Sequence, residues 1–337
     1  MSVPVIAFFN NKGGVGKTSL VYHLACMYAD LGQRILGADL DPQANLSAAF
    51  LDEDRLDELW PEGGHPQTVY GAIDPLLRGI GDVVREPYLE RLRDRLYLLV
   101  GDLGLGRFED ELSQQWPRCL DRQERAFRVM SALWRLVQAA ALQARADLVL
   151  IDLGPNLGAI NRAALVASDF LVVPLTPDLF SLQGLKNLGP TVRRWRDEWA
   201  DRRVRNPSSE LPLPEGRIQP TGYVVMQHAV RLDRPVKAYD RWVARIPGVY
   251  ATEVLGLTQT PPGTERSDPN RIGLVKHYRS LMPMAQEARK PMFDLRAADG
   301  AIGAHAATVQ DARSNFKEIA VELAKRCGVP MPAGVKA

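Results

Sequence analysis

The stretch from residue 3 to residue 31 constrains the fold more than any other part of the sequence. An apolar, β-rich run at residues 3–9 is followed by a glycine-rich loop at residues 12–16. Apolar residues then recur at spacings of three and four, as on a helix with one buried face: Leu20, Leu24, Met27 and Leu31. A strand that turns through glycines into a helix exposes backbone N–H groups at the helix N-terminus, where polyphosphate binds. The sequence therefore predicts a phosphate site in an α/β domain.

The rest of the chain repeats this alternation of strands and helices. Further strand candidates are residues 34–38, 96–100, 148–151, 170–174, 222–226 and 272–277. Helical patterns separate most of them, which favours an α/β fold with a mostly parallel, twisted sheet covered by helices on both faces. Three Pro/Gly-rich stretches are expected to be surface loops: residues 60–67, 206–216 and 260–270. We interpret residues 1–337 as one domain, in which residues 51–146 form an elaborated region without an assigned motif.

Residues 11–19 read NKGGVGKTS, and their types suit a nucleotide phosphate. Lys17 would reach the β- and γ-phosphates, and the Thr18 hydroxyl would bind Mg²⁺. The general phosphate-loop pattern has a glycine where Asn11 stands, and it does not include the extra lysine, Lys12. The segment resembles the deviant Walker A motif of the ParA/MinD family of ATPases. That resemblance implies nucleotide contacts along the loop: Lys12, Gly13, Gly14, Val15, Gly16, Lys17, Thr18 and Ser19.

In this family the extra lysine crosses a dimer interface to the nucleotide held by the other subunit. The resemblance therefore implies catalytic roles for Lys12 and Lys17 and a homodimer that sandwiches ATP. It also implies the P-loop NTPase fold, with ATP and Mg²⁺ as cofactors.

Two acidic residues, Asp39 and Asp41, follow the strand candidate at residues 34–38. Because alternate residues of a strand share a face, both carboxylates can point towards the phosphate loop. The segment resembles the family's DxDPQ-N motif. By that resemblance, Asp41 is catalytic and positions or activates the attacking water, and Asp39 supports the Mg²⁺ shell.

A second apolar strand, LVLID, ends at Asp152, as a Walker B motif requires, and Asp152 would hold Mg²⁺ directly or through water. The residues after it resemble the family's switch segment, D-x-x-P-x-L-G. Many relatives have Cys-Pro where Leu153 and Gly154 stand, and Leu153 cannot ligate iron, so a nitrogenase-reductase-type cluster is disfavoured. We expect Gly154 to make the switch more flexible. Looser resemblance near residues 222–227 and 280–293 places adenine contacts at Gln227 and Pro283.

The resemblance is greatest to ParA-type partition ATPases. It implies slow ATP hydrolysis, stimulated by a ParB-like or adaptor protein, that segregates or positions a plasmid, a chromosome or another cargo. The net charge is only +2, but residues 1–146 are net acidic and the remainder is net basic. Two arginine-rich stretches, at residues 193–205 and 231–245, suit non-specific DNA. Candidate contacts are Arg193, Arg194, Arg202, Arg203, Arg231 and Arg245. A solvated helix face with tryptophans on its buried side would explain the same pattern.

Two other function classes remain open at this point. A MinD-like membrane ATPase would use an amphipathic segment, and residues 316–327 carry an apolar stripe, although packing against the core explains it as well. A small-substrate enzyme would hide its acceptor site in residues 51–146. We find no run of about 18 apolar residues, no leader peptide and no DNA-reading module before the first strand, so we expect a cytoplasmic, nucleoid-associated protein without stable membrane insertion. The cysteines are far apart, which predicts separate reduced thiols: Cys26, Cys119 and Cys327.

Overall fold

The structure is a computed structural model that describes residues 2–226, 241–258, 268–278, 280–332 and 334–335. The predicted contacts at Gln227 and Arg231, and most of the predicted loop at residues 260–270, lie outside this described part.

The described residues form one eight-stranded sheet in the order β3-β4-β2-β5-β1-β6-β7-β8. In chain order the strands are β1 (Val5–Phe8), β2 (Ile35–Asp39), β3 (Glu90–Arg93), β4 (Leu96–Leu99), β5 (Leu148–Asp152), β6 (Phe170–Leu175), β7 (Gln219–Met226) and β8 (Arg271–Val275). All neighbours pair in parallel except β3 and β4. The predicted strands are confirmed within a few residues, whereas the edge strand β3 was not predicted.

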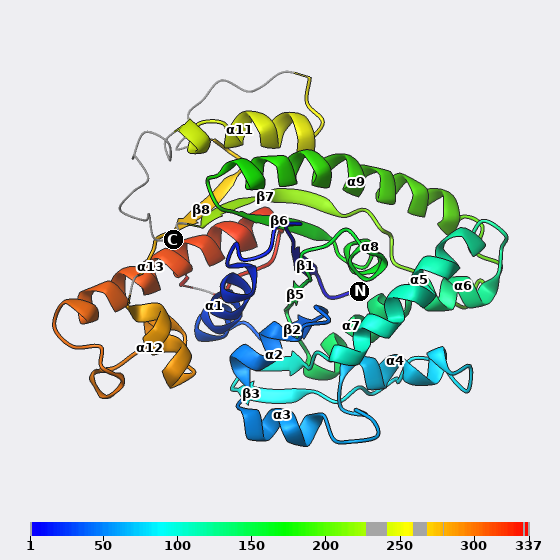
Figure 1. Cartoon of the computed structure of the whole chain (residues 1–337), viewed down its shortest axis with the longest axis horizontal. Coiled ribbons are helices and arrows are strands. Elements are labelled where there is room, and N and C mark those ends of the chain that lie inside the picture. The colour runs from blue at the N-terminus through cyan, green and yellow to red at the C-terminus, as the bar shows by residue number, and fades with distance from the viewer. Residues whose placement is uncertain (1, 227–240, 259–267, 279, 333, 336–337) are drawn as a thin grey trace.

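Helices cover both faces of this sheet, as predicted. They are α1 (Lys17–Asp30), α2 (Asn45–Phe50), α3 (Glu53–Leu59), α4 (Val69–Leu77), η1 (Leu103–Leu105), α5 (Gly106–Arg118), α6 (Glu124–Met130), α7 (Ala132–Ala144), α8 (Ala159–Val166), α9 (Leu179–Arg203), α11 (Ile246–Val249), η2 (Tyr250–Val254), α12 (Leu281–Ala288), η4 (Met292–Asp294), η5 (Ala297–Asp299) and α13 (Ala304–Arg326). In Figure 1, α1, α12 and α13 lie on one side of the sheet, and α5, α7, α8 and α9 lie on the other.

The central strand β1 shows how two hydrophobic cores form around one sheet. Val5 and Ala7 pack into the core beneath α7, α8 and α9, whereas Ile6 and Phe8 pack into the core beneath α1 and α13. All of these side chains are fully buried. A strand buried on both faces reads as a continuous apolar run, which is the pattern that residues 3–9 show.

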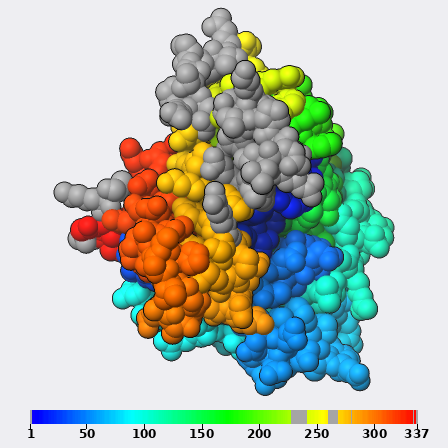
Figure 2. Space-filling view, turned by 60° about the vertical axis from the view of Figure 1, so that its left-hand side comes forward, coloured from blue at the N-terminus to red at the C-terminus, as the bar shows by residue number. Residues whose placement is uncertain are grey.

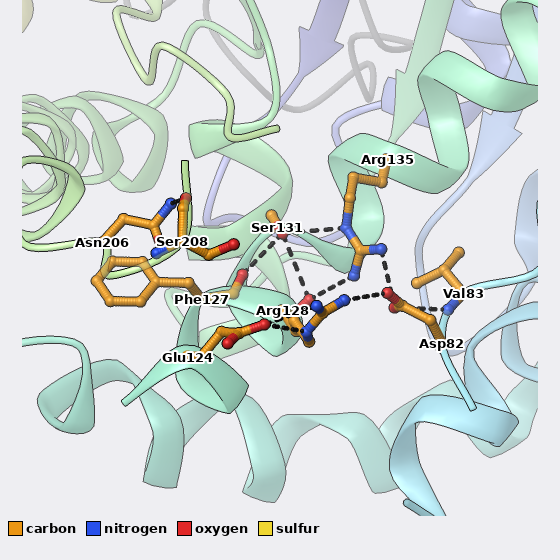
Figure 3. A network of polar contacts seen from close by, with 9 residues as sticks. All are labelled: Asp82, Val83, Glu124, Phe127, Arg128, Ser131, Arg135, Asn206 and Ser208. Carbon is orange, nitrogen blue, oxygen red and sulfur yellow. Dashed lines mark hydrogen bonds and ion pairs between the residues drawn. The ribbon is translucent and has the colours of Figure 1, made fainter. Parts of the chain in front are cut away.

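The elaborated region is fastened by the polar network in Figure 3. Asp82, in the loop after α4, accepts a hydrogen bond from Arg128 Nη1 on α6 (2.7 Å) and pairs with Arg135 Nη1 on α7 (2.8 Å). Ser131, between these helices, accepts a bond from Arg135 Nε (3.1 Å). Burial alone would raise the pKa of the Asp82 carboxyl. The Val83 N–H and the two guanidinium groups outweigh this effect and hold that pKa below its ordinary value. The loop after α4 is therefore held firmly against α6 and α7.

The apolar stripe near the end of the chain lies on α13 and is covered by the core. Its members are almost completely buried: Phe316, Ile319, Ala320, Leu323 and Cys327. The core-packing interpretation of the stripe is confirmed, which removes the feature that favoured a membrane anchor. Among the described helices, none combines the length and apolarity needed to cross a bilayer. The three cysteines are unpaired and buried, as predicted.

Candidate nucleotide site

The loop between β1 and α1 adopts the conformation that its glycines permit. Gly14 and Gly16 have φ angles of 71° and 84°, in the left-handed region that favours glycine. A Cβ on Gly16 would lie 3.0 Å from Met226 Cε, so the loop lies against the end of β7. Buried Asn10 fixes the start of the loop, since its amide donates to a β6 carbonyl (2.7 Å) and its oxygen accepts from Lys12 N (3.0 Å).

Asp152, the last residue of β5, lies against the start of α1. Its fully buried carboxylate accepts hydrogen bonds from Lys17 Nζ (2.6 Å) and Thr18 Oγ1 (2.6 Å). Burial raises the pKa of the Asp152 carboxyl, although the Lys17 ammonium opposes that shift. Mg²⁺ prefers oxygen ligands, and the Asp152 carboxylate and the Thr18 hydroxyl supply them. Lys17 and the loop N–H groups lie next to them and suit a phosphate. The residues present therefore fit a Mg²⁺-nucleotide.

Asp41 lies in the wall of the cavity next to the loop. It is 3% exposed, and its Oδ1 accepts a hydrogen bond from Gln43 N (3.0 Å). A Cβ on Gly154 would lie only 3.1 Å from that Oδ1. The glycine that departs from the family pattern thus leaves room for the Asp41 carboxylate.

Asp39, like Asp152, is fully buried and does not itself line this cavity, so its support of the Mg²⁺ shell stays a prediction. Its Oδ2 accepts hydrogen bonds from Ser47 N (2.7 Å) and Ser47 Oγ (2.8 Å), and its Oδ1 accepts one from Asp41 N (3.3 Å). Burial, with the neighbouring charge of Asp152, raises the pKa of Asp39 to about 7. Through its bonds to Ser47, Asp39 also secures the start of α2.

Lys12 is held within its own chain. Its ammonium donates to Thr176 Oγ1 (2.8 Å) and forms a short ion pair with Asp178. Asp178 also accepts from Ser181 N (2.9 Å) and caps α9. Neither partner was among the predicted site residues, because both follow β6 and only the strand order brings them next to the loop.

The asparagine that replaces the first glycine of the general motif faces α9. A Cβ on Gly184 would lie 2.6 Å from Asn11 Oδ1, so the two positions complement each other. The glycine at position 184 therefore lets α9 pack closely against the loop.

The cavity beside the loop has a volume of about 650 Å³, which is large enough for an adenosine nucleotide. The loop residues from Lys12 to Ser19 form one end. The remaining wall includes Tyr22, Asn45, Met282, Gln286, Arg289 and Lys290. Figure 2 shows the dark-blue N-terminal segment between the blue surface of α2 and α3 and the gold and orange surface of the C-terminal segment.

Pro283 is exposed and is not part of the cavity wall, so its predicted adenine contact is corrected. Its neighbour Met282 lines the cavity instead. Consecutive residues on a helix point about 100° apart, so a one-residue error in the resemblance selects the wrong side of α12.

His23 also touches the cavity but has a structural role. Its Nδ1 lies 2.6 Å from Ser19 O, and its Nε2 accepts a hydrogen bond from Met292 N (3.2 Å). An accepting Nε2 assigns the proton to Nδ1, which gives the neutral ring. Burial lowers the pKa of His23 to about 4.

Sequence reasoning missed Glu109, a residue of α5 that contacts the helix after the switch. Its carboxylate accepts hydrogen bonds from Ala159 N (2.5 Å) and Ile160 N (2.8 Å), the first residues of α8. A Cβ on Gly158 would lie 2.5 Å from Glu109 Oε1. Glu109 and Ala159 are far apart in sequence, so no local pattern indicated the contact. Only Gly158, the last residue of the switch resemblance, hinted at it, because a side chain there would collide with Glu109.

The predicted DNA-binding arginines do not share one environment. Arg194 and Arg245 are exposed, and Arg203 is half-buried. Arg193 is half-buried and donates to the carbonyls of Glu253 (2.5 Å) and Val254 (3.0 Å).

Arg202 is 7% exposed, so its predicted contact with DNA is corrected. Its guanidinium lies over the ring of Trp116 on α5, with its carbon 4.3 Å from the ring centroid. The guanidinium of Arg162 on α8 lies over the same ring at the same distance. Trp195 and Trp199 are buried on α9, as the solvated-helix interpretation expected. Arg202 thus joins α9 to α5.

Comparisons with known proteins agree with this geometry. Residues 3–204 match the AAA_31 family, an AAA domain. The chain is 35% identical over 184 residues to a putative replication protein A of Rhizobium rhizogenes, covering 54% of this chain and 42% of that protein. It is 30% identical over 189 residues to the sporulation initiation inhibitor protein Soj of Bacillus subtilis, and 32% identical over 192 residues to the chromosome partitioning protein ParA of Caulobacter vibrioides. These alignments cover 56% and 57% of this chain, and 64% and 63% of the relatives, so the chain spans less than two thirds of each.

Solved structures share the fold over nearly the whole chain. Protein DIP2308 of Corynebacterium diphtheriae superposes with a TM-score of 0.68 at 24% identity, over 96% of this chain and 98% of that one. A putative plasmid partition protein of Borrelia burgdorferi bound to AMPPNP gives 0.59 at 18% identity, over 96% and 99%. A Cyanothece McdA variant in complex with ATP gives 0.63 at 14% identity, over 98% of both chains. With a family match across more than half of its length, this chain belongs to the ParA/Soj-like family of deviant Walker A ATPases.

Proposed function

We propose that this protein is a ParA-like ATPase that dimerises around ATP, binds DNA without sequence preference and hydrolyses ATP to position a cargo. The observation that carries the proposal is that Lys12 and Lys17 contact acids that stand at the ends of the two strands on either side of β1. Lys17 bonds to Asp152 at the end of β5, whereas Lys12 bonds to Asp178 after β6. The β- and γ-phosphates of a bound nucleotide would take Lys17 from Asp152. A second protomer carrying ATP would take Lys12 from Asp178.

The hydrolytic step follows from the residues around the loop. Lys17 and the loop N–H groups hold the phosphates, and Asp41, in the cavity wall, orients the attacking water. Thr18 and Asp152 would hold Mg²⁺, which neutralises charge on the β- and γ-phosphates when it is bound. Loss of the γ-phosphate removes contacts from the switch at residues 152–158, and the dimer then separates.

The surface beside Lys12 supports a dimer. Leu179 and Phe180, the first residues of α9, are 52% and 70% exposed. They follow Asp178 directly. Large apolar side chains that stand in water next to a functional lysine favour a surface that another protein covers.

The DNA part of the proposal rests on exposed arginines. Arg241 and Arg245 lie over the Trp242 ring, with guanidinium carbons 5.3 and 5.1 Å from its centroid. Arg194 is exposed on α9, which packs against α11. Guanidinium groups attract phosphates regardless of base sequence, and a dimer presents each of them twice.

The test is binding to non-specific duplex DNA with ADP, with ATP and without nucleotide. Wild type should bind only with ATP, and raising the salt concentration should weaken the binding steeply. Lys12→Ala should lose it, whereas Lys325→Ala, the same charge change at an exposed residue of α13, should not. If ATP is hydrolysed but no DNA binds in any nucleotide state, the DNA part of the proposal is wrong.

A further inference from the structure

A second cavity lies in the region for which we found no sequence motif. It lies between α4, η1 and the first turn of α5, and its volume is about 820 Å³. We call it the α4 cavity and define it by its polar lining residues: His65, Tyr70, Asp74, Arg78 and Arg107. It shares no lining residue with the nucleotide cavity.

A buried acid fixes the His65 ring at the wall of the α4 cavity. Asp102 is fully buried, and its Oδ2 lies 2.8 Å from His65 Nδ1 and 2.6 Å from Thr68 Oγ1. Its Oδ1 accepts a hydrogen bond from Gly104 N (2.6 Å). Because Nδ1 is bound to Asp102, Nε2 is the ring nitrogen left for a ligand, and no described residue bonds to it. A carboxylate placed out of water to orient a histidine is an arrangement typical of binding sites.

Two arginines make the α4 cavity attractive to anions. Arg78 is exposed and pairs with Asp74 at 3.5 Å. Arg107 is exposed, and its guanidinium forms no hydrogen bond or ion pair with any of the described residues. It also stands in the first turn of α5, where the helix dipole disfavours a cation. An arginine left unpaired at an unfavourable helix end, beside a histidine and a second arginine, favours a negatively charged ligand.

We propose that the α4 cavity binds a small molecule with a phosphate or carboxylate group, and that Glu109 transmits this binding to the nucleotide switch. The transmission part rests on the function proposed above, whereas the binding part does not.

The route to the switch is short and made of direct contacts. Arg107 and Glu109 share the first turn of α5, and Glu109 bonds to the first two N–H groups of α8. Helix α8 starts directly after the switch at residues 152–158. Farther along, Arg162 of α8 lies over Trp116 of α5. Because both ends of this contact are held, a ligand in the α4 cavity that shifts the first turn of α5 would also shift the start of α8 or break the Glu109 bonds.

The binding part is tested by calorimetry on the full chain with saturating Mg²⁺-ADP. Inorganic phosphate and succinate serve as separate probes, so that the two arms distinguish a phosphate site from a carboxylate site. At least one probe should bind wild type. Arg107→Ala should weaken it about tenfold or more, the effect of one lost charge-assisted bond. Arg118→Ala, an exposed arginine on the same helix, should not. A probe that sits in the nucleotide site would lose its binding in Lys17→Ala.

Equal affinity in Arg107→Ala and wild type, or loss of binding in Lys17→Ala, overturns the site. Binding of neither probe to wild type at millimolar concentration overturns it as well. Because Arg107 is exposed, its replacement leaves the fold intact, and unchanged thermal unfolding would verify this.

The transmission part is measured as the change in Mg²⁺-ADP affinity that the probe causes. This readout needs no hydrolysis, so failure of the proposed ATPase cycle and failure of the α4 cavity are distinguishable. Glu109→Gln should still bind the probe but lose most of the change in ADP affinity. Asp110→Asn, the same change at the next residue, should keep it. An undiminished effect in Glu109→Gln would show that the signal does not pass through Glu109.

Discussion

Replacing Asp178 by asparagine should strengthen ATP-dependent dimerisation. Asparagine keeps an oxygen that can accept the Ser181 N–H, so α9 retains its cap. What is lost is the charge that holds Lys12. The two side chains are 27% and 21% exposed, so the pair is partly screened by solvent. Although burial raises it, the Lys12 ammonium and two hydrogen bonds hold the pKa of Asp178 below its usual value, in agreement with a favourable ion pair.

A partly buried, charge-assisted bond of this kind contributes about 1.5 kcal/mol. If Lys12 must leave Asp178 to reach the partner's nucleotide, each protomer gains a factor of about 10. Two protomers contribute, so the dimer Kd should fall by up to about 100-fold. Sedimentation equilibrium with Mg²⁺ and a slowly hydrolysed ATP analogue measures this directly. Asp197→Asn, on the same helix and exposed, is the matched control.

The double variant Lys12→Ala/Asp178→Asn separates this mechanism from a general charge effect. Without Lys12, removing the Asp178 charge should leave the dimer Kd unchanged. A Kd within twofold of wild type for Asp178→Asn, or an equal gain in the Lys12→Ala background, would refute the reasoning.

Three further predictions concern the nucleotide site and the core beside it. Asp41→Ala should bind Mg²⁺-ATP and dimerise but hydrolyse ATP at least about 100-fold more slowly, and wild-type single-turnover rates would rule Asp41 out as the water-positioning acid. Gly154→Ala should displace the Asp41 carboxylate and slow hydrolysis about tenfold at unchanged ATP affinity; an unaltered rate would show that the close contact has no role. His23, whose pKa is lowered to about 4, contributes stability that is complete above pH 6.5 and is lost as the pH falls towards 4, because the unfolded chain takes up the proton first. Chemical unfolding should show a fall of up to about 3 kcal/mol across that range, less in His23→Gln, and an equal fall in both would contradict the assignment.

Local sequence patterns predicted most of the fold. Apolar runs buried on both faces of a parallel sheet, as at residues 3–9 and 148–151, are unambiguous when glycine turns and helices follow them. The strand β3 has the sequence ERLR and only half-buried or exposed side chains, so no apolar pattern predicted it. It pairs with β4, which without β3 would be the edge strand and would leave its backbone groups unpaired.

The site residues likewise fall into those that local sequence predicts and those that depend on the tertiary arrangement. The loop and Asp152 follow strands directly, and their environment is determined within a few residues of each strand end. The partners Asp178 and Glu109 depend on which strands and helices become neighbours, which no short segment encodes. Arg202 was misjudged because an arginine-rich helix end looks alike whether a guanidinium faces water or lies over a buried indole.

That indole provides a natural optical probe. Trp116 has two cations over its ring, and the two arginines come from different helices, α8 and α9. Indole emission depends on nearby charge, because excitation shifts electron density across the ring. If α8 moves when the nucleotide changes, the Arg162 guanidinium leaves the ring and the emission of Trp116 shifts. The other five tryptophans contribute a background, which is measured in a Trp116→Phe variant and subtracted. The chain thus carries an intrinsic fluorophore for following its switch in real time without a dye label.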